Sequence, residues 1–201
     1  MKIPLPKIRE LGEALRSFFS KPFTSGFPFT PVFIPDGFRG KPQYDEKECV
    51  GCLACLEVCP ARAIECQDDK ANKLRILTHH QDICIYCQQC ENACITQKGI
   101  QLTKEFDLAT CQRQTSITQS RKELAICEHC GEIIGAVDHL RFLAKKVGNL
   151  LFANPTLLLA RLAELKLLEK SLPQNSPHPR AGHLKVLCPN CRRENILKEQ
   201  W

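Results

Sequence analysis

Residues 49–59 read CVGCLACLEVC and residues 84–94 read CIYCQQCENAC, so one cysteine spacing, C-x-x-C-x-x-C-x-x-x-C, occurs twice. The second run follows the first at an offset of 35 residues. A short apolar stretch typical of a strand follows each run, at 63–66 and 99–102. The segment 44–106 is therefore predicted to be an internal repeat of structure as well as of cysteine spacing.

The spacing within each run points to iron–sulfur clusters. Three cysteines separated by two residues wrap one side of a [4Fe–4S] cube, and in this motif the fourth cysteine binds the other cluster. We expect cluster 1 to be held by Cys49, Cys52, Cys55 and Cys94. We expect cluster 2 to be held by Cys84, Cys87, Cys90 and Cys59. A zinc or disulfide arrangement is disfavoured because two complete runs match, and the crossed ligands predict a segment that needs its iron to fold.

The remaining cysteines divide into two groups. Cys127, Cys130, Cys188 and Cys191 form two C-x-x-C pairs. Such pairs are typical of a zinc ribbon with a tetrahedral Cys₄ site, although a third iron–sulfur site, mononuclear iron and a metal-free dithiol pair remain alternatives. His129 and His183 are possible substitute ligands. Cys66 and Cys111 have no cysteine at ligand spacing, and each is expected to be a small buried or inert thiol. His79 and His80 are expected to be structural residues of a strand.

The residues between the two pairs predict a helical hairpin. Apolar spacing favours helices over about 132–147 and 154–170. Asn154 suits the N-cap of the second helix and Pro155 its first position. The stripe of Leu158, Leu162, Leu165 and Leu168 is expected to face the core, and prolines at 173, 177 and 179 predict a loop back to the last pair.

Charge and composition divide the chain into three segments, for which we expect an α+β fold. Residues 1–43 carry a net charge of +4, residues 44–110 of −4 and residues 111–201 of +6. The first segment combines an amphipathic helix near residues 8–19 with a Pro/Phe-rich arm, which packs either on its own domain or, as we favour, on a partner. The second is a bacterial 2[4Fe–4S] ferredoxin-like core, and the third carries the helical hairpin and the Cys₄ site.

Several function classes find no support in the residues. We find no constellation of catalytic acid, base or nucleophile, and no basic patch interleaved with aromatic residues of the kind that binds nucleic acid. No secretory signal and no apolar run long enough to cross a bilayer are visible. Cysteines arranged for metal binding indicate a reducing compartment. The expectation is an electron-transfer protein that is not an enzyme by itself.

The same residues resemble a known family. The stretches FRGKP at 38–42, CVGCLACLEVCPARAI at 49–64, CIYCQQC at 84–90 and FDLA at 106–109 resemble the two-cluster subunit of respiratory complex I. The second run departs from the pattern. Its last cysteine, Cys94, is followed by Ile95, whereas Cys59 of the first run is followed by Pro60. The C-terminal pairs are similar instead to the corresponding subunit of formate hydrogenlyase and related membrane-bound [NiFe] hydrogenases.

The resemblance implies a place in a chain of clusters. The implied partners are the hydrogenase small and large subunits, a membrane-arm subunit, and an electron-donor iron–sulfur or dehydrogenase subunit. The implied location is the cytoplasm, peripheral on the inner face of the cytoplasmic membrane. The equivalent subunit of a complex I-like quinone oxidoreductase and a soluble ferredoxin with a zinc-ribbon tail remain alternatives. The electron donor stays open among formate dehydrogenase, carbon monoxide dehydrogenase and ferredoxin, as does the direction of flow.

Overall fold

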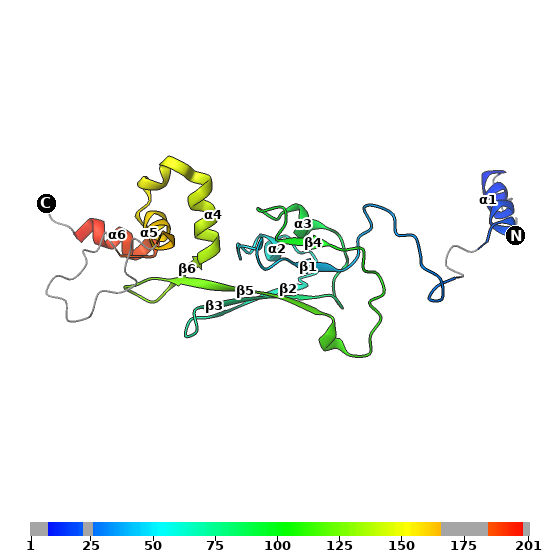
Figure 1. The fold of residues 1–201 in the computed structure, drawn as a ribbon, viewed down its shortest axis with the longest axis horizontal. Helices are drawn as coiled ribbons and strands as arrows, with labels where there is room; N and C mark the ends of the chain where they lie inside the picture. Colours follow the sequence, from blue (N-terminus) through cyan, green and yellow to red (C-terminus); the bar gives the residue numbers. More distant parts are fainter. Residues whose placement is uncertain (1–7, 22–25, 166–184, 199–201) are drawn as a thin grey trace, which may run out of the picture. The chain divides into compact units, whose positions relative to one another are not determined.

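The computed structural model describes residues 8–21, 26–165 and 185–198 (Figure 1). The chain divides into two compact units, Met1–Phe38 and Arg39–Trp201. The first unit contains α1 (Ile8–Phe19), which is the amphipathic helix predicted from the sequence, and none of its residues is buried. Among the described residues, no helix has the length and apolar character needed to cross a membrane.

The second unit begins with the predicted repeat, and its two halves have the same order of elements. The first half contains β1 (Pro42–Tyr44), α2 (Ala54–Glu57) and β2 (Ile64–Asp69). The second contains β3 (Leu74–His80), α3 (Gln89–Asn92) and β4 (Ile100–Leu102). The halves interlock, because β1 pairs antiparallel with β4 and β2 with β3.

The repeat extends to the backbone conformation of single residues. Residues with positive φ occur as pairs 35 positions apart: Gly51 and Tyr86 (68° and 52°), Leu53 and Gln88 (69° and 70°), Arg62 and Gln97 (50° and 61°). Positive φ is uncommon outside glycine and costs energy there. Five of these six residues are not glycine, so the loops around the cysteines impose this conformation in both halves.

The segment after the repeat joins the same sheet. A 3₁₀ turn (Arg113–Thr115) leads into β5 (Ile117–Ile126), which pairs antiparallel with β3 along the whole of β3. Strand β6 (Ile133–Ala136) pairs with β5 and completes a four-stranded sheet in the order β2-β3-β5-β6. In Figure 1, β5 runs from beside β3 to β6 as one long strand. The sequence predicted a boundary between a second segment, 44–110, and a third, 111–201. Main-chain hydrogen bonds between β3 and β5 cross this boundary.

The predicted helical hairpin is present, with corrections to its bounds. Helix α4 spans Val137–Val147, a 3₁₀ turn spans Gly148–Ala153 and α5 spans Pro155–Glu164, and α4 and α5 contact each other. The expectation of a helix from residue 132 was wrong, because 133–136 pair with β5 as β6. The Asn154 cap is confirmed: its side-chain oxygen accepts bonds from the N–H groups of Thr156 (3.1 Å) and Leu157 (3.3 Å).

The apolar stripe of the second helix is also corrected. Leu159, which is not a member of the stripe, is buried at 4% exposure, whereas Leu165 is 51% exposed. Helix α5 faces the core through Leu159 and Thr156, so its buried face is rotated from the predicted one. Leu168, the rest of the predicted helix to residue 170 and the three prolines lie outside the described residues. Helix α6 (Pro189–Lys198), which the sequence did not predict, follows Cys188.

Two hydrophobic clusters hold the second unit together, and both contain cysteines. The first comprises Tyr44, Cys49, Cys55, Ile64, Leu77 and Ile100. The second comprises Cys127, Leu187, Cys188 and Cys191. Because cysteines are members of both clusters, a metal bound to these cysteines would add to the stability of the fold.

Candidate metal centres

The first cavity lies beside the first cysteine run. Cys49, Cys52 and Cys55 line it together with Cys94 from the second run. Tyr44, Leu77 and Ile100, all buried, form part of its wall. The structure therefore brings together the four residues expected to hold cluster 1.

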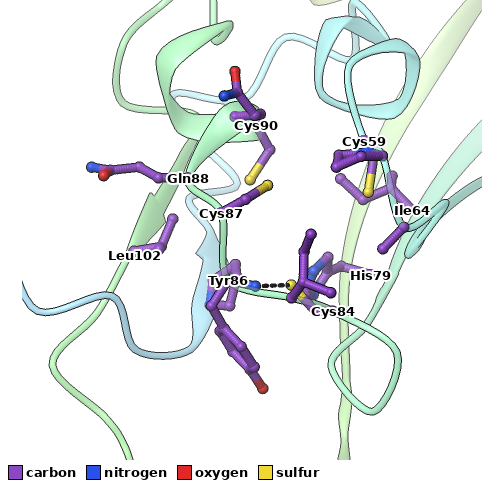
Figure 2. Close-up of a pocket in the computed structure, with 14 residues that line it drawn as sticks. Cys59, Ile64, His79, Cys84, Tyr86, Cys87, Gln88, Cys90 and Leu102 are labelled. Atoms are coloured by element: carbon purple, nitrogen blue, oxygen red, sulfur yellow. Dashed lines mark hydrogen bonds between the residues drawn. The ribbon is translucent and has the colours of Figure 1, made fainter.

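The second cavity repeats this arrangement with the roles of the runs exchanged. Cys84, Cys87 and Cys90 line it together with Cys59 from the first run. Figure 2 shows Cys59 on its own segment, facing the loop that carries the other three. The four residues expected to hold cluster 2 thus surround one space, and each run supplies three cysteines to one cavity and one to the other.

Several polar groups are directed at these sulfurs. The N–H of Ala63 donates to Cys59 Sγ (3.2 Å), and the N–H of Tyr86 donates to Cys84 Sγ (3.4 Å, dashed in Figure 2). The Thr96 hydroxyl lies 3.3 Å from Cys94 Sγ. Hydrogen bonds to sulfur and burial are the means by which a protein tunes an iron–sulfur site. Four cysteines around each cavity with N–H donors at sulfur fit the donor set of two [4Fe–4S] clusters.

The surroundings of the cysteines shift their acidity in both directions. Burial raises the pKa of Cys55 to about 12 and that of Cys90 to about 11. The pKa of Cys94 is lowered, because the Thr96 hydroxyl and nearby main-chain N–H groups outweigh its burial. Thiolates at the buried positions need a positive partner, which the iron of a bound cluster would supply.

Tyr44 and His79 occupy equivalent positions in the two halves, 35 residues apart. Tyr44 lines the first cavity, with its hydroxyl 3.8 Å from Cys55 Sγ, and His79 lines the second. Burial, with a smaller effect of His80, lowers the pKa of His79 to about 4, and its Nδ1 is buried without a hydrogen-bond partner. The prediction that His79 lies on a strand is confirmed, and the structure adds that it faces a cavity.

Two buried cations, which the sequence did not single out, support the first run. Arg75 (7% exposed) donates from Nη1 to the Gly51 carbonyl (3.0 Å) and forms two 2.7 Å bonds with Asp68. Lys122 (6% exposed) donates from Nζ to the Glu46 carbonyl. Both come from the four-stranded sheet, so β3 and β5 brace the loop that begins the first run. A sequence signal existed only for Arg75, as a charged residue among the apolar residues Leu74, Ile76 and Leu77.

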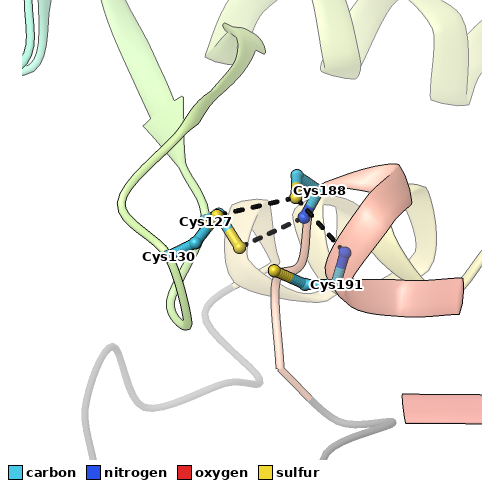
Figure 3. A group of neighbouring side chains, drawn as sticks. All are labelled: Cys127, Cys130, Cys188 and Cys191. Atoms are coloured by element: carbon cyan, nitrogen blue, oxygen red, sulfur yellow. Dashed lines mark hydrogen bonds between the residues drawn. The ribbon is translucent and has the colours of Figure 1, made fainter. Parts of the chain in front are cut away.

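The last four cysteines form a separate group. One ligand atom from each of Cys127, Cys130, Cys188 and Cys191 lies within 4.8 Å of the others (Figure 3). The sulfurs of Cys130 and Cys188 are 3.7 Å apart. A tetrahedral zinc site with Zn–S bonds of about 2.3 Å requires sulfurs about 3.8 Å apart. The group therefore has the spacing of a mononuclear Cys₄ site.

The two pairs reach this site from different elements. Cys127 and Cys130 lie in the turn between β5 and β6, where Gly131 has φ of 73° and its N–H donates to the Cys127 carbonyl (3.0 Å). Cys188 precedes α6 and Cys191 lies on it, as Figure 3 shows. Half of the site thus has the hairpin expected of a zinc ribbon, and the other half is at the start of a helix.

Main-chain N–H groups stabilise negative charge at this site. The N–H of Cys188 donates to Cys127 Sγ (3.3 Å), and the N–H of Cys191 donates to Cys188 Sγ (3.5 Å). The pKa of Cys127 falls to about 6, because such bonds from Cys130, Cys188 and His129 outweigh its burial. His129 Nδ1 lies 3.6 Å from Cys191 Sγ, next to the group, and His183 lies outside the described residues.

The two unassigned cysteines have different surroundings. Cys66 is half-buried, its Sγ lies 3.4 Å from Asp68 Oδ1, and burial together with Asp68 raises its pKa to about 11. Cys111 is exposed, so it is not a buried thiol, and the expectation that it is inert stays a prediction.

Comparison with known proteins supports an iron–sulfur domain around the two runs. Residues 39–98 match the family of 4Fe-4S dicluster domains. This dicluster segment begins at the first residue of the second compact unit. It includes all eight cysteines of the two cavities.

The chain is similar to a formate hydrogenlyase subunit and to subunits of quinone oxidoreductases, as the sequence resemblance predicted. It is 35% identical to formate hydrogenlyase subunit 6 of Escherichia coli over 53% of this chain and 59% of that protein. It is 26% identical to NAD(P)H-quinone oxidoreductase subunit I of Gloeobacter violaceus over 46% of each. The chain spans about half the length of these curated relatives.

One similar solved structure is a chain of the membrane-bound sulfane sulfur reductase, an archaeal respiratory membrane complex. It is 26% identical, with a TM-score of 0.38, and the match covers 57% of this chain and 61% of that chain.

Proposed function

We propose that this protein is an electron-relay subunit that holds two [4Fe–4S] clusters within a membrane-associated oxidoreductase complex. The observation that carries the proposal is the crossed arrangement: each cavity is lined by three cysteines of one run and the fourth of the other. The match of residues 39–98 to 4Fe-4S dicluster domains supports the same assignment.

The clusters, when bound, supply one-electron chemistry, and the chain supplies the surroundings. Cys59 and Cys94 each cross to the other half, so the two sites share one frame. Tyr44, Leu77 and Ile100 keep water from the first site, because all three are buried in its wall. N–H and hydroxyl groups at Cys59, Cys84 and Cys94 stabilise negative charge on sulfur.

For the complex itself, we infer a formate hydrogenlyase-like [NiFe] hydrogenase. The relative at 35% identity is a formate hydrogenlyase subunit. The partners would be the hydrogenase small and large subunits, a membrane-arm subunit and an electron-donor subunit, and the location the inner face of the cytoplasmic membrane. Proton reduction would then take place in a partner, so the chain acts in electron transfer and not as an enzyme by itself.

We further propose that the Cys₄ group binds one structural zinc ion. The 3.7 Å separation of the Cys130 and Cys188 sulfurs and the N–H bonds to Cys127 and Cys188 support this. A single ion at this position would fasten α6 to the turn between β5 and β6. A filled tetrahedral site leaves no open position for catalysis, so its role is structural.

The central experiment is metal analysis of the full chain purified without oxygen. The expected result is about eight iron atoms, about eight inorganic sulfides and one zinc per chain, with electron paramagnetic resonance signals of two reduced [4Fe–4S] clusters. A stable folded chain without iron would overturn the two-cluster proposal. Iron well above eight atoms with no zinc would overturn the zinc assignment alone.

A second candidate is the equivalent subunit of a quinone-reducing complex, which the similarity to NAD(P)H-quinone oxidoreductase subunit I favours. Purification of the intact complex separates the two. A nickel-containing partner and hydrogen evolution support the hydrogenase, whereas quinone reduction without nickel supports the alternative. Recovery of the chain from its native source as a stable monomeric ferredoxin would refute both.

A further inference from the structure

A cleft that is distinct from the two cysteine-lined cavities lies next to the first cysteine run. It is a cleft of about 510 Å³ between α4 and the loops that flank Cys49 and Cys94. Its lining residues include Lys47, Val50, Ile95, Thr96, Arg141, Lys145 and Lys146. We call it the α4 cleft.

The α4 cleft is basic. Four cationic side chains line it, against two acidic ones, Glu48 and Asp138. Asp138 is already shared between Arg141 (3.0 Å) and the buried Lys122 (3.4 Å). Lys145 and Lys146 are exposed, so the surplus positive charge is available to a molecule that enters the cleft.

The wall between the cleft and the first cavity is thin. Val50, Ile95 and Thr96 line both spaces, and the Thr96 hydroxyl lies 3.3 Å from Cys94 Sγ. A group seated in the cleft is therefore separated from the first cluster site by one layer of side chains. Among the described residues, none lines both the α4 cleft and the second cavity.

We propose that the α4 cleft is the docking site for an acidic surface of a one-electron redox protein, which exchanges electrons with the chain through the first cluster. This inference rests on the proposed function and names the class of partner and the point of contact. A [4Fe–4S]²⁺ core with four thiolates carries a net charge of about −2. An acidic partner approaching such a site needs cations to offset the repulsion, and the cleft places them beside the cluster.

The step itself is a transfer of one electron, with no bond made or broken. The partner's centre loses one electron as the first cluster gains one, or the reverse. No proton needs to accompany the electron. The basic cleft speeds formation of the encounter complex and orients it, and the thin wall keeps the distance of electron transfer short.

The test uses the double variant Lys145→Glu/Lys146→Glu of the cluster-loaded full chain. The matched control is Lys73→Glu/Arg121→Glu, which changes net charge equally at two exposed residues that do not line the cleft. The probes are an acidic plant-type [2Fe–2S] ferredoxin and basic cytochrome c. Electron exchange is followed by stopped-flow absorbance, in the direction that the potentials favour.

Roughly a tenfold or greater fall in the ferredoxin rate at low salt is expected for the cleft variant, with a much smaller fall for the control. The difference in ferredoxin rate between the cleft variant and the wild type should shrink at about 0.5 M salt, where screening is strong. With the basic cytochrome c, the cleft variant should react faster than the wild type. Equal ferredoxin rates in the two double variants would overturn the proposal.

Two further measurements keep the outcomes distinct. Iron content and electron paramagnetic resonance are recorded first for the wild type and for each variant. A wild-type chain that fails to hold two clusters counts against the proposed function. Two intact clusters with an unchanged ferredoxin rate count against the docking site alone. Glutamate near the C-terminal end of α4 also costs some helix stability, and the variant Lys145→Gln/Lys146→Gln, which avoids this cost, should show an intermediate rate.

Discussion

Replacing Arg75 with methionine would test how the four-stranded sheet supports the first cysteine run. The Arg75 guanidinium joins Asp68 on β2 to the Gly51 carbonyl in the loop between Cys49 and Cys52. Its side chain is 8% exposed and that of Asp68 is 24% exposed. The substitution removes the charge and all three hydrogen bonds while keeping much of the apolar volume.

The magnitude follows from what the substitution leaves behind. Removing one partner of a buried ion pair costs about 3–5 kcal/mol, because the other charge stays buried. Asp68 keeps some contact with water, so we expect the lower end, about 3 kcal/mol. If all of this free energy is expressed in the loss of the first cluster, the rate of loss rises roughly 150-fold, since each 1.4 kcal/mol is tenfold.

The assay is anaerobic transfer of iron from the full chain to a chelator. The shifted NMR signals of the cysteine β-protons around each cluster report on the two sites separately. We expect the first cluster to be lost at least about tenfold faster in Arg75→Met, with little change at the second. Arg75→Lys, which keeps the charge without the planar fork, should fall between this variant and the wild type.

The control is Arg113→Met. Arg113 is paired with Asp82, but its side chain is 79% exposed. Exposed ion pairs contribute little, about 0–1 kcal/mol, so we expect close to wild-type loss of both clusters. The reasoning is refuted if Arg75→Met behaves like Arg113→Met, or if it accelerates loss of both clusters equally.

Three other substitutions probe separate features. In Gly99→Ala the new Cβ would lie 3.0 Å from Cys49 Cα and 3.2 Å from Cys94 Sγ, so cluster 1 should assemble with reduced iron content, and an unchanged content contradicts this. Asn154→Ala should lower stability by about 1 kcal/mol through loss of the α5 cap, whereas Asn154→Ser should retain most of it in thermal unfolding. Because the pKa of His79 is lowered to about 4, the folded chain binds fewer protons than the unfolded chain between that value and the ordinary 6.5. The free energy of unfolding of the chain should therefore fall by about 2 kcal/mol between about pH 7.5 and about pH 5. In denaturant titrations, His79→Gln should reduce this loss. If the pH profile of the variant equals that of the wild type, His79 is not the source of the loss.

The sequence was sufficient for the features that depend on local spacing. The offset of 35 residues predicted two equivalent halves, and the paired positive φ values at Gly51 and Tyr86 show how closely the halves agree. The Asn154 cap was also readable, because an N-cap depends on a few consecutive residues. The hairpin between the C-x-x-C pairs followed from apolar spacing in the same way.

Other elements were misread because their partners are distant in sequence. Residues 133–136 have apolar spacing compatible with a helix, but pairing with β5 makes them a strand. On α5, packing selects Leu159 over the predicted stripe, since the buried face depends on where α4 lies. Such choices are made by tertiary contacts that override local preference.

The paired cysteine runs, taken from the sequence alone, determined the donor set of both cavities, because ligand type and spacing are local properties. Only the tertiary structure brought Arg75 and Lys122 to the loop that begins the first run, placed Tyr44 in the wall of the first cavity and His79 in that of the second, and formed the basic α4 cleft beside Val50 and Ile95. Those features arise where β3, β5 and α4 meet loops far away in the chain. The electrostatic interactions of these residues depend on distances between atoms in space, and the order of residues along the chain does not specify those distances.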